Sequence, residues 1–393
     1  MDYPLSGLKV LDFSRVLAGP FAGRMLSDLG ADVVKVEPPE GDVTRFWGKS
    51  IADLPGYYHQ QNAGKRNICA DLREPAAIAV IEALVKEADI VIENYRPDVM
   101  GRLGLGYDHL KTINPRIIML SISGFGHGGP ESRRPAYAPV IHAEAGLIHR
   151  SASEAANADR GRHYQDLPLS VADTNASLHG LVGLLAAVIH RQTTGQGQHI
   201  DIAMIDATVA TDDKIHYDLE ASWETAPLRN EIYDLPHGPV LLSTDFRLLF
   251  KRLVELGYIE DPSKSSDSFD EKVAKRREAA EAFLQSLETE AAFDAVMQAM
   301  NFAWGRVRNP VDARDQATLR ARGAIVDVDD RVGGLRPVTQ SPYRFSGAKS
   351  GVRGPAPHRG EHNAAVLSDW LGLDEAAVSA LQDQGALLDN PKR

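Results

Sequence analysis

The chain of 393 residues contains a single cysteine, Cys69, which excludes a fold held together by internal disulfide bonds. Basic residues are not in excess either: the net charge of -11 argues against a nucleic-acid partner, because phosphate binding needs a basic face. No uninterrupted apolar run approaches the length that crosses a bilayer, and the opening MDYPLSGLKVLDF lacks the features of a signal peptide. We therefore expect a soluble cytoplasmic protein without a membrane partner.

Several catalytic signatures are also missing: there is no G-x-S-x-G elbow, no P-loop and no paired-cysteine zinc motif. The stretch HRGEH (358–362) has the letters of a zinc signature that works only on a helix, and the preceding GPAP disfavours a helix. We therefore expect no metal site. The loop GFGHGG (124–129) follows a strand, but Pro130 and ESRR stand where a dinucleotide fingerprint needs a helix. We expect this loop to pass near a ligand, and Cys69 to be buried and inert.

What is present is an alternation of Val- and Ile-rich runs with amphipathic patterns. The expected strands span residues 8–13, 31–37, 65–71, 89–95 and 116–126, and the expected helices span 20–30 and 75–88. This alternation predicts an α/β fold with a parallel sheet covered on both faces. Ligands of such sheets bind beyond the carboxyl ends of the strands, which directs attention to the loops SRVLAGP, ENYRP and GFGHGGP.

The pattern changes near residue 214, and the length suits two domains. Residues 1–214 are expected to form the first part of a large domain and residues 215–320 a smaller one. Residues 321–393 return to short strands and a final helix.

The stretch from Leu167 to Ala207 is the most unusual part of the chain. Asp173 precedes a nearly charge-free helical pattern that should be buried on most of its circumference, and the strand 199–204 follows. A carboxylate at the start of a buried helix is stabilised by the helix dipole and can act as a nucleophile. The alternative is that Asp173 only caps the helix. Lys65 and Arg66 are either solvated or placed to meet a phosphate.

Several motifs occur together and in one order: LSGLKVLDFSRVLAGPFAGRMLSDLGADVVKVEPPEGD, NAGKRNICADL, VIENYRPDVMGRLGLGYDHL, SGFGHGGP and VADTNASLHGLVGLLAAVIHRQTTGQGQHIDIAM. In these motifs the chain resembles CoA-transferase family III, also called the CaiB/BaiF family. The resemblance implies a Rossmann-like large domain built from both chain termini, a smaller α+β domain and an interlocked homodimer. It also implies coenzyme A or acyl-CoA and a carboxylic acid as substrates, without a permanently bound cofactor.

The resemblance also suggests functional residues. It implies that Asp173 attacks the donor thioester, giving a mixed anhydride and then an aspartyl-CoA thioester. Tyr137 is expected to be the second catalytic residue, with its phenol donating a hydrogen bond to a carboxylate or thioester oxygen. The positions implied to line the coenzyme A site are Arg15, Val16, Leu17, Ala18, Asn94, Tyr95, Arg96, Arg102, Leu103 and Met204.

Two alternatives remain open. Acyl-CoA racemases of the family have a histidine where this chain has Tyr137, and a phenol is a weak base near neutral pH. His142, five residues further on, is expected to face elsewhere. Formyl-CoA transferase has a glutamine at the position of Leu17, which disfavours formyl and oxalyl substrates here. A non-catalytic acyl-CoA-binding protein is the other alternative, and the intact Asp173 argues against it.

Overall fold

A computed structural model describes residues 2–155, 164–222 and 230–389 of the chain. The chain divides into a large unit, residues 1–213 and 320–393, and a small unit, residues 214–319. Both ends of the chain therefore belong to the large unit.

A parallel six-stranded sheet with the order β5-β2-β1-β6-β7-β8 organises the large unit. Its strands are β1 (Lys9–Asp12), β2 (Asp32–Glu37), β5 (Arg66–Cys69), β6 (Ile90–Glu93), β7 (Ile118–Ser123) and β8 (His199–Ala203). The strand order reverses between β1 and β6, so the chain leaves these two neighbours in opposite directions. A crevice at such a reversal is the usual ligand site of an open parallel sheet.

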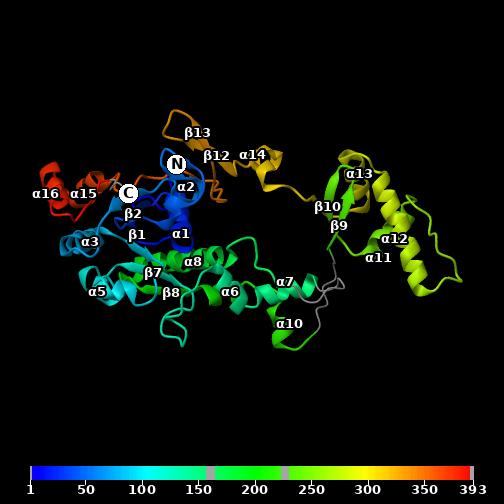
Figure 1. Ribbon diagram of the computed structural model, residues 1–393, viewed down its shortest axis with the longest axis horizontal. Helices are drawn as coiled ribbons and strands as arrows, with labels where there is room; N and C mark the ends of the chain where they lie inside the picture. The colour runs from blue at the N-terminus through cyan, green and yellow to red at the C-terminus, as the bar shows by residue number, and fades with distance from the viewer. Residues whose placement is uncertain (1, 156–163, 223–229, 390–393) are drawn as a thin grey trace. The chain divides into compact units, whose positions relative to one another are not determined.

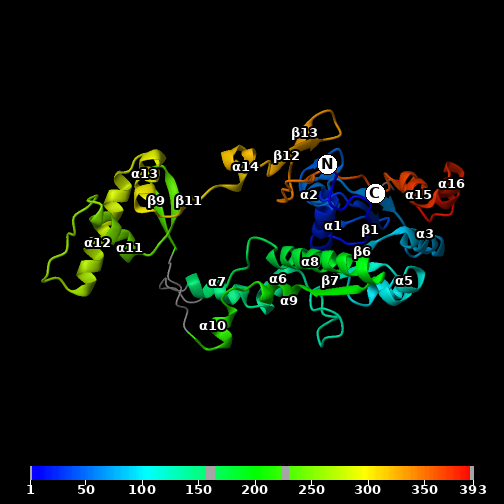
Figure 2. The same cartoon turned by 180° about the vertical axis from the view of Figure 1, so that it is seen from behind.

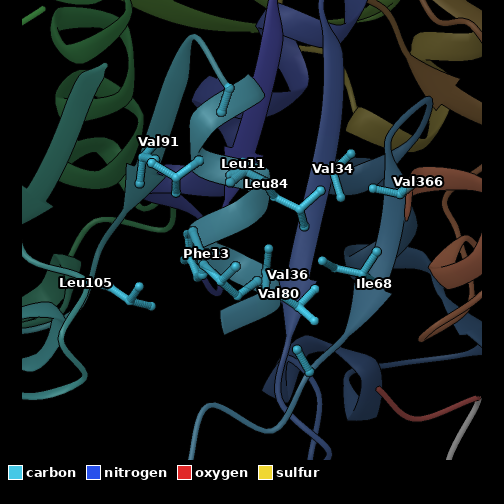
Figure 3. Close-up of a cluster of buried hydrophobic side chains, with 14 of the residues drawn as sticks. Leu11, Phe13, Val34, Val36, Ile68, Val80, Leu84, Val91, Leu105 and Val366 are labelled. Atoms are coloured by element: carbon cyan, nitrogen blue, oxygen red, sulfur yellow. The ribbon is translucent and has the colours of Figure 1, made fainter. Parts of the chain in front are cut away.

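Helices cover both faces of this sheet (Figure 1). One face carries α1 (Ala18–Asp28), α6 (Ala138–Glu144), α8 (Val171–Thr194) and α9 (Met204–Ala210), and the other carries α3 (Pro75–Glu87), α5 (Tyr107–Ile113), α15 (Asn363–Leu371) and α16 (Glu375–Asp383). Figure 3 shows Leu11, Val34, Ile68 and Val91 of four strands gathered with Leu84 of α3. The alternating pattern of the sequence therefore produces the expected layers.

The C-terminal segment returns to the sheet. Val366 of α15 belongs to the core formed by the first strands and α3, and both views place α15 beside that part of the chain (Figures 1 and 2). Arg24 of α1 donates a 3.0 Å hydrogen bond to the carbonyl of Thr339, at the end of the hairpin β12 (Ile325–Asp329) and β13 (Leu335–Thr339). Residues more than 300 positions apart thus hold the site-bearing unit together.

The small unit has an antiparallel sheet, β11-β10-β9, and three main helices. Its elements are α10 (Ile215–Leu219), β9 (Asn230–Leu235), β10 (Gly238–Ser243), α11 (Phe246–Glu255), α12 (Phe269–Ser286), α13 (Glu290–Met300) and β11 (Trp304–Arg306). Ser268 and Glu271 form a reciprocal capping box at the start of α12, which explains why the polar loop ends there. The remaining short elements of the described ranges are β3 (Ser50–Ile51), β4 (Leu54–Pro55), α2 (Gly56–Asn62), α4 (Val99–Arg102), α7 (Leu147–Ala155), α14 (Ala317–Ala321) and the 3₁₀ helices η1 (Val43–Phe46) and η2 (Pro310–Asp315).

Two sequence expectations about helices need correction. α1 begins at Ala18, two residues before the expected start at Pro20. Pro20 is tolerated in the first turn because the N–H group that proline lacks would have no partner within the helix there. α8 is long and apolar enough to cross a membrane by length and composition, contrary to the expectation from uninterrupted runs. It nevertheless packs against the sheet as a core helix.

α8 is also less buried than its composition suggests. Leu178, Val182 and Ile189 are 44%, 67% and 64% exposed, and they follow each other at helical spacing. The helix therefore presents an apolar stripe, defined by these three residues, that the described residues of the chain leave exposed.

Candidate active site

Asp173 lies in the first turn of α8, but it is not the N-cap of the helix. Ser170 occupies the N-cap position and its side chain makes no capping bond, so Asp173 is the third helical residue. Its carboxylate accepts a hydrogen bond from the backbone N–H of Ala18, at the start of α1. The plain capping interpretation is therefore wrong, and the side chain faces the beginning of a second helix.

The surroundings of Asp173 raise the pKa of its carboxyl group, but not so far that the group stays protonated at neutral pH. Burial raises the pKa of Asp173 from 3.8 to about 6, although the hydrogen bond from Ala18 acts in the opposite direction. Above pH 6 the group is a carboxylate that is poorly solvated. Such a carboxylate is a better nucleophile than one surrounded by water.

The loop between β1 and α1 forms one wall beside Asp173. Val16 has a φ of 66°, a conformation that is strained for a β-branched residue, and its N–H donates to Asp42 Oδ2 at 3.1 Å. A Cβ at Gly19 would overlap Ser14, so glycine is required where the chain turns into the helix. The hydrogen bond to Asp42 thus helps to hold a backbone conformation that valine rarely adopts.

The loop after β6 is attached to this wall by Asn94. Its Oδ1 accepts from the N–H of Arg15 at 2.7 Å, and its Nδ2 donates to the carbonyl of Arg15 at 2.8 Å. The two loops at the strand-order reversal therefore move as one piece. Because both polar ends of Asn94 are engaged with backbone, this side chain positions the wall.

A cleft of about 370 Å³ opens between these loops and Asp173. It is lined by Arg15, Val16, Ala18, Val43, Asn94, Tyr95, Arg96, Pro97, Val99, Ile122, Ser123, Gly124, Ser132, Arg134, Ala136, Tyr137, Asp173 and Met204. Two of its donors, Ser123 Oγ and Arg15 Nε, are buried without a hydrogen-bond partner among the described residues. Such groups are costly unless a ligand or water satisfies them.

The structure gathers most of the residues singled out in the sequence around this cleft, but not all of them. Leu17, Arg102 and Leu103 are absent from its lining within the described ranges. Leu17 is buried before α1, and Leu103 packs against the core around α3. Arg102 is exposed at the end of α4, 3.6 Å from Asp98.

Tyr137 comes into the cleft through the glycine-rich loop. Its side chain is 71% exposed and stands just before α6. A Cβ at Gly124 would overlap the side chain of Ala136, so this glycine allows the Tyr137 segment to approach the end of β7. The loop after β7 therefore lines a cleft, as its position after a strand indicated.

Two expectations about charged residues are wrong. Lys65 is 3% exposed, and its Nζ lies 2.8 Å from Asp12 Oδ2, so it neither faces solvent nor meets a phosphate. Arg66 is engaged with Asp32 and Asp369. His142 faces away from the cleft, as expected: it is not among the residues that line the cleft, and its ring contacts the first turn of α8. No local sequence pattern indicates these contacts, because each joins residues from separate elements.

Cys69 and the stretch 358–362 have the local structure that the sequence predicts. Cys69 is fully buried at the end of β5, and burial raises the pKa of its thiol to about 12, which makes it unreactive. The stretch 358–362 forms a turn that precedes α15. In it the N–H of His358 donates to Glu361 at 2.6 Å, and the N–H of Asn67 donates to His362 at 3.3 Å.

The burial of Asp173 predicts an unusual pH dependence of stability. Because its folded pKa of about 6 is above the ordinary 3.8, ionisation destabilises the folded state, and the penalty grows as the pH rises through this window. We expect Asp173→Asn to be more stable than the parent by about 2–3 kcal/mol near pH 7.5, and equally stable near pH 4. Denaturant unfolding at the two pH values measures the difference. A variant less stable than the parent near pH 7.5 would contradict the placement of the carboxyl group.

Comparisons with known proteins agree on one family. The model of "CoA-transferase family III" matches residues 5–363. The succinate–glutarate CoA-transferase of Agrobacterium fabrum is 30% identical, with 95% of this chain and 98% of that protein aligned. The human succinyl-CoA:glutarate CoA-transferase is 29% identical over 98% of this chain and 90% of its own.

A solved structure extends this agreement to the fold. The CaiB/BaiF family protein from Brucella suis superposes on this chain with a TM-score of 0.79 at 29% identity. The superposition covers 94% of this chain and 100% of the Brucella suis chain. The family match, the aligned transferases and the shared fold cover nearly the same residues. The chain therefore belongs to CoA-transferase family III.

Proposed function

We propose that the protein is an acyl-CoA:carboxylate CoA-transferase and that Asp173 is its covalent nucleophile. The observation that carries the proposal is the half-buried Asp173 with its pKa near 6, in a cleft where the loops after β1 and β6 meet. The relatives named as CoA-transferases support the reaction class. The residues Arg15, Val16, Ala18, Tyr95, Arg96 and Met204 are the proposed contacts of coenzyme A.

In the proposed reaction the Asp173 carboxyl group is joined in turn to the donor acyl group, to CoA and to the acceptor acyl group. Asp173 attacks the thioester carbonyl of the donor, the carbon–sulfur bond breaks, and a mixed anhydride and CoA thiolate result. The thiolate attacks the aspartyl carbonyl, which releases the donor acid and leaves an aspartyl-CoA thioester. The acceptor carboxylate then forms a second anhydride and frees the thiolate, which takes the acceptor acyl group and regenerates Asp173.

The cleft offers charge and hydrogen bonds suited to these anions. Arg15 and Arg96 contribute guanidinium groups, and Ser123 contributes a hydroxyl that has no protein partner in the described structure. Donors held in place before the reaction stabilise the negative oxygen of a tetrahedral intermediate without reorganising. This supports carboxylates and thioesters as the ligands.

Racemisation is the competing function, and heavy water distinguishes it from transfer. A racemase needs a base that titrates near the working pH to remove the α-proton, and the cleft has Tyr137 where racemases have histidine. We expect transfer of CoA between acids without incorporation of deuterium at the α-carbon of a 2-methylacyl-CoA. Mass spectrometry of the product measures both. Deuteration at a rate comparable with transfer would favour the racemase.

We further propose that two chains form an interlocked homodimer. The apolar stripe of α8, Leu178, Val182 and Ile189, supports this, because a stripe of this kind on a helix of a soluble protein is ordinarily covered. An obligate interface would be large and apolar. The stripe lies on the helix that carries Asp173, so dimer formation and the geometry of the nucleophile are linked.

We expect a mass near twice 42.8 kDa at micromolar concentration. Val182→Arg should shift the protein toward monomers or aggregates, since an arginine in an apolar interface leaves a charge unpaired. Light scattering with sedimentation measures this, and Val311→Arg, at a valine that is 76% exposed in the small unit, serves as the control. A parent protein that is a stable monomer would contradict the dimer.

A further inference from the structure

His142 of α6 is a buried histidine that lies beside the nucleophile without lining the cleft. It is 1% exposed, and both ring nitrogens are engaged. Nδ1 lies 2.8 Å from Oδ1 of Asp166, and Nε2 lies 3.2 Å from the backbone nitrogen of Ala172. The first partner is a carboxylate and the second is a fixed N–H donor.

These two partners determine where the proton of the ring resides. The N–H of Ala172 can only donate, so Nε2 of His142 must carry a lone pair. Nδ1 then carries the proton and donates it to Asp166. The imidazole is therefore neutral, in one tautomer, and has no nitrogen left to exchange a proton with a substrate.

The acceptor that His142 offers replaces a missing helix cap. Ala172 is the second residue of α8, and the Ser170 side chain at the N-cap position makes no capping hydrogen bond. The first N–H groups of a helix have no partner within it, and each needs an external acceptor. His142 supplies one to the turn that carries Asp173, the residue that follows Ala172.

Asp166 has a second role in the same arrangement. Its Oδ1 also accepts from the N–H of Leu167 at 2.8 Å, which ties the segment that enters α8 to the histidine. The carboxylate thus connects α6, the entry to α8 and the first turn of α8 through one imidazole. A ring free to flip to the other tautomer would present an N–H to the N–H of Ala172 and push this turn away.

We propose that the Asp166–His142 pair is a positioning device that fixes the first turn of α8 and so aims the Asp173 carboxylate at the thioester. The proposal depends on the proposed function, in which Asp173 is the nucleophile. His142 is a positioning residue because it acts through the backbone of Ala172. A displacement of about 1 Å can reduce a rate by about two orders of magnitude, so loss of the pair should slow bond formation more than binding.

The test compares two substitutions of different chemistry. His142→Leu keeps an apolar bulk but offers no acceptor, whereas His142→Gln carries an acceptor and a donor on one amide and can reproduce both bonds. We expect His142→Leu to form the covalent adduct at least about tenfold more slowly in single turnover, with CoA affinity within about twofold. His142→Gln should stay within about threefold of the parent. Equal adduct rates in the parent and His142→Leu would overturn this inference but leave the proposed function intact.

A second measurement does not depend on turnover. In protein labelled with ¹⁵N-histidine, the signal lost in His142→Gln identifies His142. Near pH 7.5 we expect the ¹⁵N chemical shifts of a neutral ring that carries its proton on Nδ1 and none on Nε2. A ring with the proton on Nε2 would overturn the inference, even if His142→Leu does not fold. A parent protein that forms no adduct from any donor would instead overturn the proposed function, and this inference with it.

Discussion

Asp173→Ala is expected to retain less than about 1% of the turnover of the parent protein, while folding and CoA binding persist. The reason is that no other described carboxylate lines the cleft. Removing a covalent nucleophile typically costs several orders of magnitude, and any remaining rate comes from binding alone. Steady-state transfer assays with calorimetric CoA titration measure the two properties separately.

A matched control is available on the neighbouring helix. Asp206 also lies in the first turn of a helix, α9, but it is exposed. Asp206→Ala should keep turnover within about twofold, as is usual for exposed positions away from a site. Residual activity of Asp173→Ala well above 1% would mean that another group accepts the acyl chain.

The second large effect is expected at Lys65, which belongs to a buried ion network beneath the cleft wall. Its partner Asp12 would have a raised pKa from burial, but Lys65 and Lys35 outweigh this and hold the pKa below its ordinary value. Lys35 in turn donates to the carbonyl of Ser14 at 2.7 Å and lies 3.2 Å from Asp42. The network therefore connects the core to the loop that carries Val16.

We expect Lys65→Met to reduce the free energy of unfolding by about 3–5 kcal/mol, because it leaves Asp12 charged and buried without its main partner. Denaturant unfolding at one fixed protein concentration measures the change. The adjacent Arg66→Met is the control, since its ion pairs with Asp32 and Asp369 are partly exposed and should cost about 1 kcal/mol or less. A loss at Lys65 no larger than that at Arg66 would contradict the network.

The large-scale order of the fold could be predicted from local patterns. Valine- and isoleucine-rich runs such as those of β2 and β6 form buried parallel strands, because both faces of such a strand are covered. Asp173 could be singled out because a charged residue before an apolar helix is unusual. The loops after β1, β6 and β7 were identified because ligands bind where parallel strands end.

The contacts that shape the site could not be predicted in this way. Nothing in a local window shows that Asp42 accepts the N–H of Val16, or that Lys65 pairs with Asp12 across 53 positions. The role of His142 depends on two partners, 24 and 30 positions further along the chain. Such contacts arise only after the layers assemble, and composition does not distinguish them from solvated charges.

The stripe on α8 illustrates a different limit. A nearly charge-free helix predicts burial but not the partner that covers it. In a single chain one face of α8 packs against the sheet while Val182 remains 67% exposed. Sequence periodicity describes the apolar surface, but it does not identify what covers it.

The most direct test of the account is the detection of a covalent intermediate on Asp173. The protein is incubated with a panel of succinyl-, acetyl- and branched acyl-CoA donors without an acceptor, digested and analysed by mass spectrometry. We predict an acyl or CoA adduct on the peptide that contains Asp173, which disappears when the acceptor acid is added. Transfer of CoA between acids without such an adduct, or with the adduct on another residue, would contradict the account.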